Sequence, residues 1–163
     1  MSTDIFIKIE GPELKGECKV AGYEDWIEAG SFSESVFIPR DGSGSGQAAG
    51  RANLSEFSVS SEVGAHSNFL KEAILGNTHY DKVTVHFVKQ QPGEGAGVKP
   101  YDTRVIEHAF VSSYSTSKGS DQKGQEAWAF GGTKVEWEYF LQADNGLIGA
   151  SKGKKFWDIA ASK

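Results

Sequence analysis

Short runs in which apolar and polar residues alternate recur along most of this chain. In the first run Ile5, Ile7 and Ile9 fall on one face of a two-residue repeat, and residues 80–88 and 134–141 repeat the pattern. Side chains alternate between the two faces of a β-strand but recur every 3.6 residues on a helix, so this spacing indicates strands. Gly, Ser, Asn and Asp between the runs are typical of turns. Together these patterns favour a mainly β fold, either a barrel or a sandwich.

The segment from Trp26 to Ile38 is predicted to be one long strand of this fold. Ser31, Ser33 and Ser35 would then share one face of the strand, because side chains two residues apart point the same way. A face made of small polar residues should meet water or another polar surface.

Residues 39–50 carry no apolar periodicity and are rich in glycine, with Asp41-Gly42-Ser43-Gly44-Ser45-Gly46 at their centre. Glycine tolerates backbone angles that other residues avoid, so this segment is predicted to be a long exposed loop. It lacks the Lys-Ser or Lys-Thr pair that ends a phosphate-binding P-loop, so phosphate binding is not favoured.

Near the end of the chain two further runs, residues 126–130 and 134–141, are separated by Gly131 and Gly132. Two strands joined by a short turn that contains glycine typically pair with each other. We therefore expect these two runs to form an antiparallel hairpin.

One segment has the periodicity of a helix. Residues 67–75 are predicted to form an α-helix, with Ser67 as its N-cap and Gly76 at its end. The apolar stripe of this helix consists of Phe69, Leu70, Ala73 and Ile74. This stripe is expected to pack on a sheet.

The length of 163 residues suits one domain, so residues 1–163 are expected to form a single unit. The net charge of -5 and the mixed signs along the chain argue against a nucleic-acid surface and against membrane binding. We find neither an apolar run long enough to span a bilayer nor a charged and apolar leader, so we expect a soluble protein made in the cytoplasm.

No combination of residues in the sequence predicts a catalytic, cofactor or metal site. The histidines lack the spacing of metal ligands; they are His66, His79, His86 and His108. The single cysteine, Cys18, can form neither an internal disulfide nor a metal site by itself. Glu136 and Glu138 share a strand face about 7 Å apart, as some glycosidase pairs do, but a solvated strand face explains them more simply. A small domain without such a site commonly acts by assembling with copies of itself.

Several motifs, taken in order along the chain, resemble one protein family. They are Asp4-Ile5-Phe6-Ile7-Lys8-Ile9, Lys15-Gly16-Glu17, Trp26-Ile27-Glu28, the glycine-rich loop, the helix before His79-Tyr80, Val111-Ser112-Ser113-Tyr114-Ser115 and Val135-Glu136-Trp137-Glu138-Tyr139. Each motif is a short pattern. Their conjunction over nearly the whole chain is similar to Hcp, the haemolysin-coregulated tube protein family of bacterial type VI secretion.

The resemblance implies a small β-barrel of two packed, mostly antiparallel sheets, with one α-helix at about residues 67–75 on its flank. It also implies hexameric rings that stack into a hollow tube, as in phage tail tube proteins. Sheath contraction would carry the tube from the bacterial cytoplasm to the extracellular space or a target cell. The implied partners are further copies of the chain, the tip spike protein, the contractile sheath and small effector proteins. The resemblance implies no catalytic residue, cofactor or metal.

Two sets of site residues follow from the resemblance. Hcp-like proteins commonly carry an aromatic-serine-aromatic strand whose serine faces the lumen, and Phe32-Ser33-Glu34 is the corresponding segment here. Ser33 is therefore the lumen candidate, with Ser31 and Ser35 on the same predicted face, while Glu34 in place of an aromatic leaves the register open. An outward solvent face on a monomer is the alternative. The loop residues Asp41, Gly42, Ser43, Gly44, Ser45 and Gly46 match an extended loop between stacked rings, so a stacking contact is expected of them.

Two other functions remain to be compared with a tube subunit. One is a monomeric β-barrel binding module for a small ligand or glycan, with Trp128 and Trp137 as an aromatic platform. The other is a hydrolytic toxin, which is sometimes fused to proteins of this family. We expect no such added domain here, because the sequence stops after residues 156–163. An exposed aromatic cluster would favour the binding module.

Overall fold

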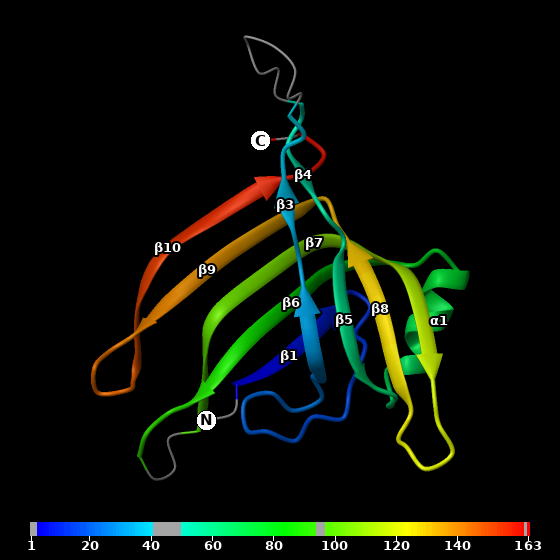
Figure 1. Ribbon diagram of the computed structural model, residues 1–163, viewed down its shortest axis with the longest axis horizontal. Coiled ribbons are helices and arrows are strands. Elements are labelled where there is room, and N and C mark those ends of the chain that lie inside the picture. The colour runs from blue at the N-terminus through cyan, green and yellow to red at the C-terminus, as the bar shows by residue number, and fades with distance from the viewer. Residues whose placement is uncertain (1–2, 41–49, 94–96, 162) are drawn as a thin grey trace.

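The computed structural model describes residues 3–40, 50–93, 97–161 and 163 (Figure 1). The helix in this part of the chain is α1 (Ser67–Leu75). The strands are β1 (Thr3–Glu10), β2 (Ile27–Ser33), β3 (Val36–Phe37), β4 (Asn53–Leu54), β5 (Phe57–Glu62), β6 (His79–Gln90), β7 (Val98–Ser117), β8 (Gln125–Gly131), β9 (Lys134–Gln142) and β10 (Ile148–Asp158).

Six of the strands close into an antiparallel barrel. Their order is β7-β6-β1-β2-β5-β8, and β8 pairs back with β7 to complete the circle. β7 has 20 residues, and it pairs with β6 and β9 along its first part and with β8 along its second. β9 and β10 continue the sheet beyond β7. The predicted mainly β barrel with a helix on its flank is confirmed.

In the described structure β8 and β9 pair with other strands, so the predicted hairpin is wrong. β8 lies between β5 and the second part of β7, whereas β9 lies between β10 and the first part of β7. At Gly131 and Gly132, on the way from β8 to β9, the chain crosses from the second part of β7 to its first part. A Cβ atom at Gly132 would collide with the side chain of Ile106 and with the carbonyl oxygen of Glu107. The second glycine therefore marks a close approach to β7 instead of a hairpin turn.

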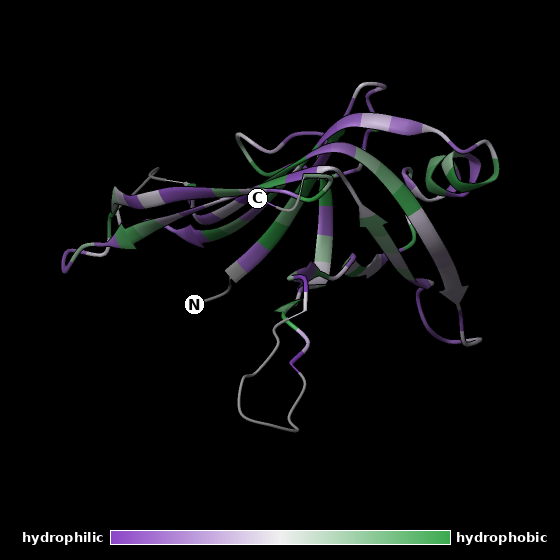
Figure 2. Cartoon of the chain, turned by 90° about the horizontal axis from the view of Figure 1, so that it is seen from above, coloured by the Kyte–Doolittle hydropathy of each residue, from purple (hydrophilic) through white to green (hydrophobic). Residues whose placement is uncertain are grey.

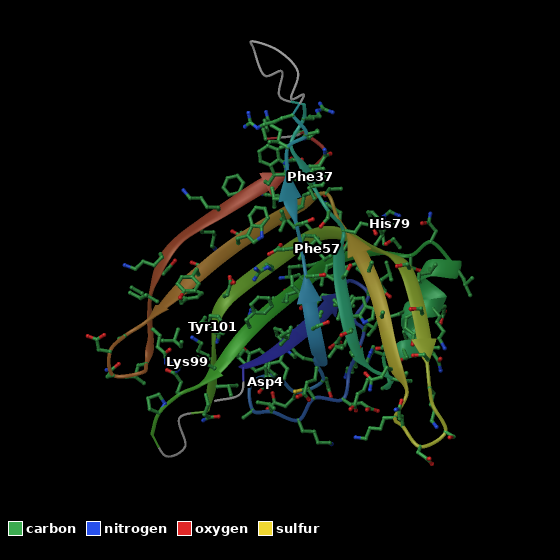
Figure 3. The ribbon with its side chains drawn as sticks, in the orientation of Figure 1. Asp4, Phe37, Phe57, His79, Lys99 and Tyr101 are labelled. Carbon is green, nitrogen blue, oxygen red and sulfur yellow. The ribbon has the colours of Figure 1, made fainter. Side chains whose placement is uncertain are left out.

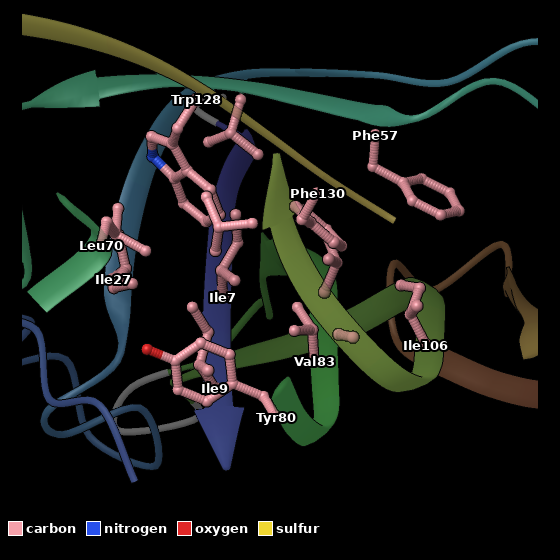
Figure 4. Packing of buried hydrophobic residues seen from close by; sticks show 14 of the residues in the cluster. Ile7, Ile9, Ile27, Phe57, Leu70, Tyr80, Val83, Ile106, Trp128 and Phe130 are labelled. Atoms are coloured by element: carbon pink, nitrogen blue, oxygen red, sulfur yellow. The ribbon is translucent and has the colours of Figure 1, made fainter. Parts of the chain in front are cut away.

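The inward faces of the barrel strands form one apolar core (Figure 4). Ile7 and Ile9 are fully buried in it, as the alternation predicts, and Ile5 packs against its margin. Phe57 of β5 stacks on Phe130 of β8 with ring centres 5.2 Å apart. Burying one large apolar side chain contributes about 1.5–3 kcal/mol, so this core is the main source of the stability of the barrel.

A smaller apolar cluster lies on the other face of β1. Phe6 stacks on Tyr23 with ring centres 4.6 Å apart, and Cys18 and Val88 complete the cluster. The segment between β1 and β2, which supplies Cys18 and Tyr23, therefore covers the outward side of β1 and β6. Burial raises the pKa of the Cys18 thiol, so the thiol stays protonated at neutral pH.

His86 of β6 lies beside this smaller cluster. Its Nδ1 atom is 3.0 Å from the hydroxyl oxygen of Tyr23. Burial lowers the pKa of His86 to about 4 and raises the pKa of Tyr23 to about 12. At neutral pH the Tyr23 hydroxyl therefore keeps its proton and donates a hydrogen bond to an uncharged imidazole.

This pair predicts that mild acid destabilises the protein. Because the pKa of His86 is lower in the folded chain than in the unfolded chain, the unfolded chain binds more protons between about pH 6.5 and pH 4, and stability falls as the pH falls. We expect wild type to lose about 2 kcal/mol more than His86→Phe between about pH 7.5 and pH 5, measured by urea unfolding. His79→Phe is the matched control because His79 is exposed. Equal pH dependence in wild type and His86→Phe would contradict the prediction.

The start of α1 differs from the prediction. The N-cap residue is His66, and Ser67 lies inside the first turn and is buried. The Ser67 hydroxyl donates a hydrogen bond to Glu126 Oε2 at 2.7 Å and accepts one from the Gly64 N–H at 2.9 Å, and no side chain among the described residues caps the helix. The prediction of Ser67 as the N-cap is therefore wrong by one residue, because Ser67 is already part of the helix.

The apolar stripe of α1 is narrower than predicted. Leu70 and Ala73 are buried in the main core, and Ile74 packs against them. Phe69 is 58% exposed, so its predicted packing on a sheet is wrong. The helix therefore contacts the barrel along one edge.

The predicted strand from Trp26 to Ile38 is divided in two. β2 ends at Ser33, and β3 begins at Val36 and pairs with β4 in a separate two-stranded sheet. Figures 1 and 2 show β3 and β4 projecting away from the barrel. We call residues 36–40 and 51–54 the β3–β4 arm.

Candidate functional site

Four neighbouring strands carry small residues on their outward side. Ser31 and Ser33 of β2 are exposed, and the strand register pairs them with Ser60 and Ser58 of β5. The hydroxyl oxygens of Ser31 and Ser60 are 2.5 Å apart. This row of small outward residues continues across β8 and the second part of β7. We call this surface the small-residue face, and its members are Ser31, Ser33, Ser58, Ser60, Ala127, Ala129, Ser113 and Ser115.

Residues at the intervening positions point into the barrel. Phe32 packs against the main core, and Val59 and Trp128 are buried within it. The alternation of the sequence thus separates large inward side chains from small outward ones on the same strands.

Ser35 is exposed and follows the end of β2, so strand register does not place its side chain, and its position on the predicted face stays a prediction. Its backbone N–H donates a hydrogen bond to Ser55 Oγ at 2.8 Å, and its carbonyl oxygen accepts one from the Ser55 N–H at 2.8 Å. Ser35 therefore fastens the base of the β3–β4 arm. The stacking candidates Asp41, Gly42, Ser43, Gly44, Ser45 and Gly46 lie outside the described residues.

Glu34 lies on the inner side of the sheet at the same base. Arg104 Nε donates a hydrogen bond to Glu34 Oε1 at 2.5 Å, and Trp137 Nε1 donates one to Glu34 Oε2 at 3.1 Å. The Arg104 guanidinium carbon lies 4.4 Å from the centre of the Phe87 ring. The side chains of Arg104 and Glu34 are only 11% and 17% exposed. This ion pair holds the junction between β2 and β3 against β7 and β9.

A buried carboxylate joins α1 to the barrel. Glu126 of β8 accepts hydrogen bonds from His66 Nε2, from Ser61 Oγ at 2.6 Å, from Ser67 Oγ at 2.7 Å and from Tyr114 Oη at 2.5 Å. Burial alone would raise the pKa of Glu126, but these hydrogen bonds outweigh burial and hold the pKa at about 2. Glu126 is therefore ionised at neutral pH. No motif in the sequence marks Glu126 as a functional residue, although it has the same two-residue phase as the buried Trp128 and Phe130.

Trp128 and Trp137 do not form a platform together, although Trp137 lines a small apolar pocket with Phe156 and Trp157. Trp128 is 2% exposed, and Trp137 lies under Glu34. Within the described residues, no three His, Cys, Asp or Glu side chains are grouped so that they could hold a metal ion. In the same part of the chain, no helix is both long and apolar enough to cross a membrane.

The barrel and its flanking helix have the same fold as several solved type VI secretion proteins. A solved type six secretion system protein has a TM-score of 0.88 to this chain at 23% identity, with 99% of each chain covered. Hcp1 from Salmonella typhimurium has a TM-score of 0.78 at 20% identity, over 99% of this chain and 97% of its own. Hcp3 from Pseudomonas aeruginosa has a TM-score of 0.68 at 17% identity, over 96% of this chain and 99% of its own.

The sequence itself matches one family. Residues 6–139 match the family described as "Type VI secretion system effector, Hcp". The chain therefore belongs to the Hcp family, and the resemblance of its motifs is confirmed. No curated protein sequence matches this chain.

Proposed function

We propose that this protein is a tube subunit of a bacterial type VI secretion system. Six copies form a ring, rings stack into a hollow tube, and contraction of the surrounding sheath exports the tube with small effectors in its lumen. Membership of the Hcp family and the shared fold support this proposal. The observation that carries it is the small-residue face.

The small-residue face has the properties that a water-filled bore needs. It spans four adjacent strands, and none of its members is charged or large. Serine hydroxyls hydrogen-bond to water, and short side chains leave the bore wide. In this proposal Ser31 and Ser33 face the lumen, while Ser35 stays at the base of the β3–β4 arm. The loop from Asp41 to Gly46 contacts the next ring.

The proposed partners are further copies of the chain, the tip spike protein, the contractile sheath and small effector proteins. The protein is made in the bacterial cytoplasm and leaves through the assembled tube. It acts by assembly and transport, without catalysis.

The assembly is tested by light scattering and negative-stain electron microscopy of the purified protein. We expect particles with six times the mass of one chain and images of rings with a central hole. A clean monomer at high protein concentration would contradict the proposal.

The lumen position of Ser33 is tested with Ser33→Trp. Six indole rings would project into the bore, so we expect rings of normal mass with a visibly narrower hole and the loss of most bound effector. Asn68→Trp on the exposed side of α1 is the matched control, and it should leave the hole unchanged. A hole of normal width in the Ser33→Trp ring would place this face elsewhere.

A further inference from the structure

A cavity of about 500 Å³ opens at the end of the barrel where β2 begins and β5 ends. Its wall includes Glu17, Glu28, Glu62 and Val63. The glutamates come from the segment before β2, from β2 and from β5. This end of the barrel is at the bottom of Figure 1, opposite β3, on which Figure 3 labels Phe37. A cavity of this volume is large enough to hold a small molecule.

Two of the glutamates face each other across neighbouring strands. The register that pairs Ala29 of β2 with Ser61 of β5 places Glu28 opposite Glu62. Like charges at opposite positions of two strands repel each other and lower stability. Among the ion pairs of the described residues, Glu62 pairs with Lys123 at 3.6 Å in an exposed contact, and none involves Glu28. A cationic group bound between the two carboxylates would relieve their repulsion.

A buried acceptor borders the same cavity. His66 is 4% exposed and belongs to the cavity wall, and its Nε2 atom donates to the ionised carboxylate of Glu126. Nδ1 of the neutral ring is then an acceptor, and it has no hydrogen-bond partner among the described residues. A Cβ atom placed on Gly64 would lie 3.4 Å from His66 Nδ1 and 3.3 Å from Glu17 Oε2. The imidazole and this carboxylate thus border one open space beside Gly64.

These groups define the chemistry of a ligand. The three glutamates and the His66 imidazole all accept hydrogen bonds, so they suit cationic groups that only donate. Within the described residues no three His, Cys, Asp or Glu side chains are grouped closely enough to hold one metal ion. The acceptors are spread over several segments, so a ligand with several cationic groups can reach them together. Val63 is 46% exposed at the same wall and can contact methylene groups between the cations.

We propose that the cavity binds a small aliphatic polyamine, which combines ammonium groups with short methylene chains. One ammonium group lies between Glu28 and Glu62, and another lies between Glu17 and His66 Nδ1. The methylene chain between them contacts Val63. All of these residues belong to one chain, so the site does not depend on the proposed tube function.

Calorimetric titration of the purified protein with spermidine tests the site. We expect saturable binding of one spermidine molecule per chain. The second titration compares putrescine, which has two ammonium groups, with Mg²⁺, which carries the same charge. General attraction to a chain with a net charge of -5 would treat these two cations alike, whereas the proposed site should bind putrescine at least about tenfold more tightly. Absence of saturable spermidine binding, or equal affinity for putrescine and Mg²⁺, overturns the proposal.

Removal of two carboxylates locates the ligand in the cavity. Glu17→Gln with Glu28→Gln should weaken spermidine binding at least about tenfold at low salt. Glu13→Gln with Glu72→Gln is the matched control, because it removes the same charge from exposed positions outside the cavity wall, and it should leave the affinity within about twofold of wild type. Wild-type affinity in the Glu17→Gln, Glu28→Gln protein overturns the proposal.

Gly64→Ala tests the site without a change of charge. Its methyl group would occupy the space between Glu17 Oε2 and His66 Nδ1, so we expect spermidine binding to weaken at least about fivefold. Gly149→Ala is the matched control, because a Cβ atom there makes ordinary contact with the Leu141 carbonyl oxygen at 3.6 Å, away from the cavity. Wild-type affinity in a folded Gly64→Ala protein overturns the placement of the second ammonium group and with it the proposal.

A basic segment of another protein is the competing occupant. A tetralysine peptide is therefore titrated in parallel, and a protein that binds this peptide but not spermidine would overturn the polyamine site. Particle mass is measured by light scattering on the same samples. A monomer that binds spermidine would contradict the tube function and keep the polyamine site, whereas rings that bind no spermidine would keep the tube and overturn the site.

Discussion

Replacing Glu126 by leucine is expected to lower the free energy of unfolding by about 3–5 kcal/mol. The carboxylate is fully buried and accepts four hydrogen bonds, from His66, Ser61, Ser67 and Tyr114. Leucine leaves these donors buried without an acceptor, and each unsatisfied group costs about 1–3 kcal/mol. Two of the donors belong to the start of α1, so the attachment of this helix to the barrel should weaken first.

Urea unfolding at neutral pH measures this effect. Glu107→Leu on β7 is the matched control, because Glu107 is exposed, and it should change stability by no more than about 0.5 kcal/mol. A Glu126→Leu protein within about 1 kcal/mol of wild type would show that the hydrogen bonds contribute little.

The same variant has a defined pH dependence. Because the pKa of Glu126 is about 2 in the folded protein and 4.5 ordinarily, the stabilisation by its charge is complete above pH 4.5 and is lost as the pH falls toward 2. The difference between wild type and Glu126→Leu should therefore shrink over this range.

Alternation predicted which residues of a strand lie inside, but it did not predict which strands pair. Ile7 and Ile9 are buried as expected because their burial depends only on the two-residue period. β8 and β9 are neighbours in sequence and yet pair elsewhere, because β7 is long enough to bind each of them at a different place. Gly132 lies close to Ile106 and Glu107 of β7, which are distant in sequence. The residues around Gly132 therefore could not predict this close approach.

Tertiary contacts also decided the details of α1. Ser67 has the sequence signature of an N-cap, but the helix starts one residue earlier than that signature predicts, and the Ser67 hydroxyl donates to Glu126 and accepts from the Gly64 N–H. Phe69 fits the helical stripe and is nevertheless exposed, because the barrel covers only the side with Leu70 and Ala73. The spacing of apolar residues predicts which side of a helix is apolar, but it does not predict how much of that side the rest of the protein covers.

The candidate surfaces were predicted only where one strand contains them. Ser31 and Ser33 could be recognised from a single run, and the structure adds the partners from β5, β7 and β8. The cavity draws on segments that are distant in sequence, so no motif marks it. Glu34 stands where the family pattern has an aromatic residue. Its carboxylate pairs with Arg104, which lies on another strand, so the sequence around Glu34 gives no sign of this role.

Replacing Arg104 by methionine is expected to cost about 2–4 kcal/mol and to release the β3–β4 arm. Methionine keeps the packing on Phe87 but leaves the Glu34 carboxylate largely buried, with Trp137 as its remaining donor. The carboxylate can recover its hydration only if the junction between β2 and β3 moves away from the sheet. Backbone amides of β3 and β4 should therefore exchange hydrogen faster in this variant, in addition to the loss measured by urea unfolding.

Two further variants separate the buried pair from an ordinary surface pair. Lys154→Met removes the contact between Lys154 and Glu136, whose side chains are 53% and 33% exposed, and it should cost no more than about 0.5 kcal/mol. Arg104→Met also ends the contact between Arg104 and Asp102, whose side chain is 24% exposed. Adding Glu34→Leu removes the more buried of the two carboxylates, so the double variant should be more stable than Arg104→Met alone. If the double variant is less stable than Arg104→Met, the cost comes from lost packing at the base of the arm and not from a stranded charge. The order of these stabilities thus identifies what holds the arm in place.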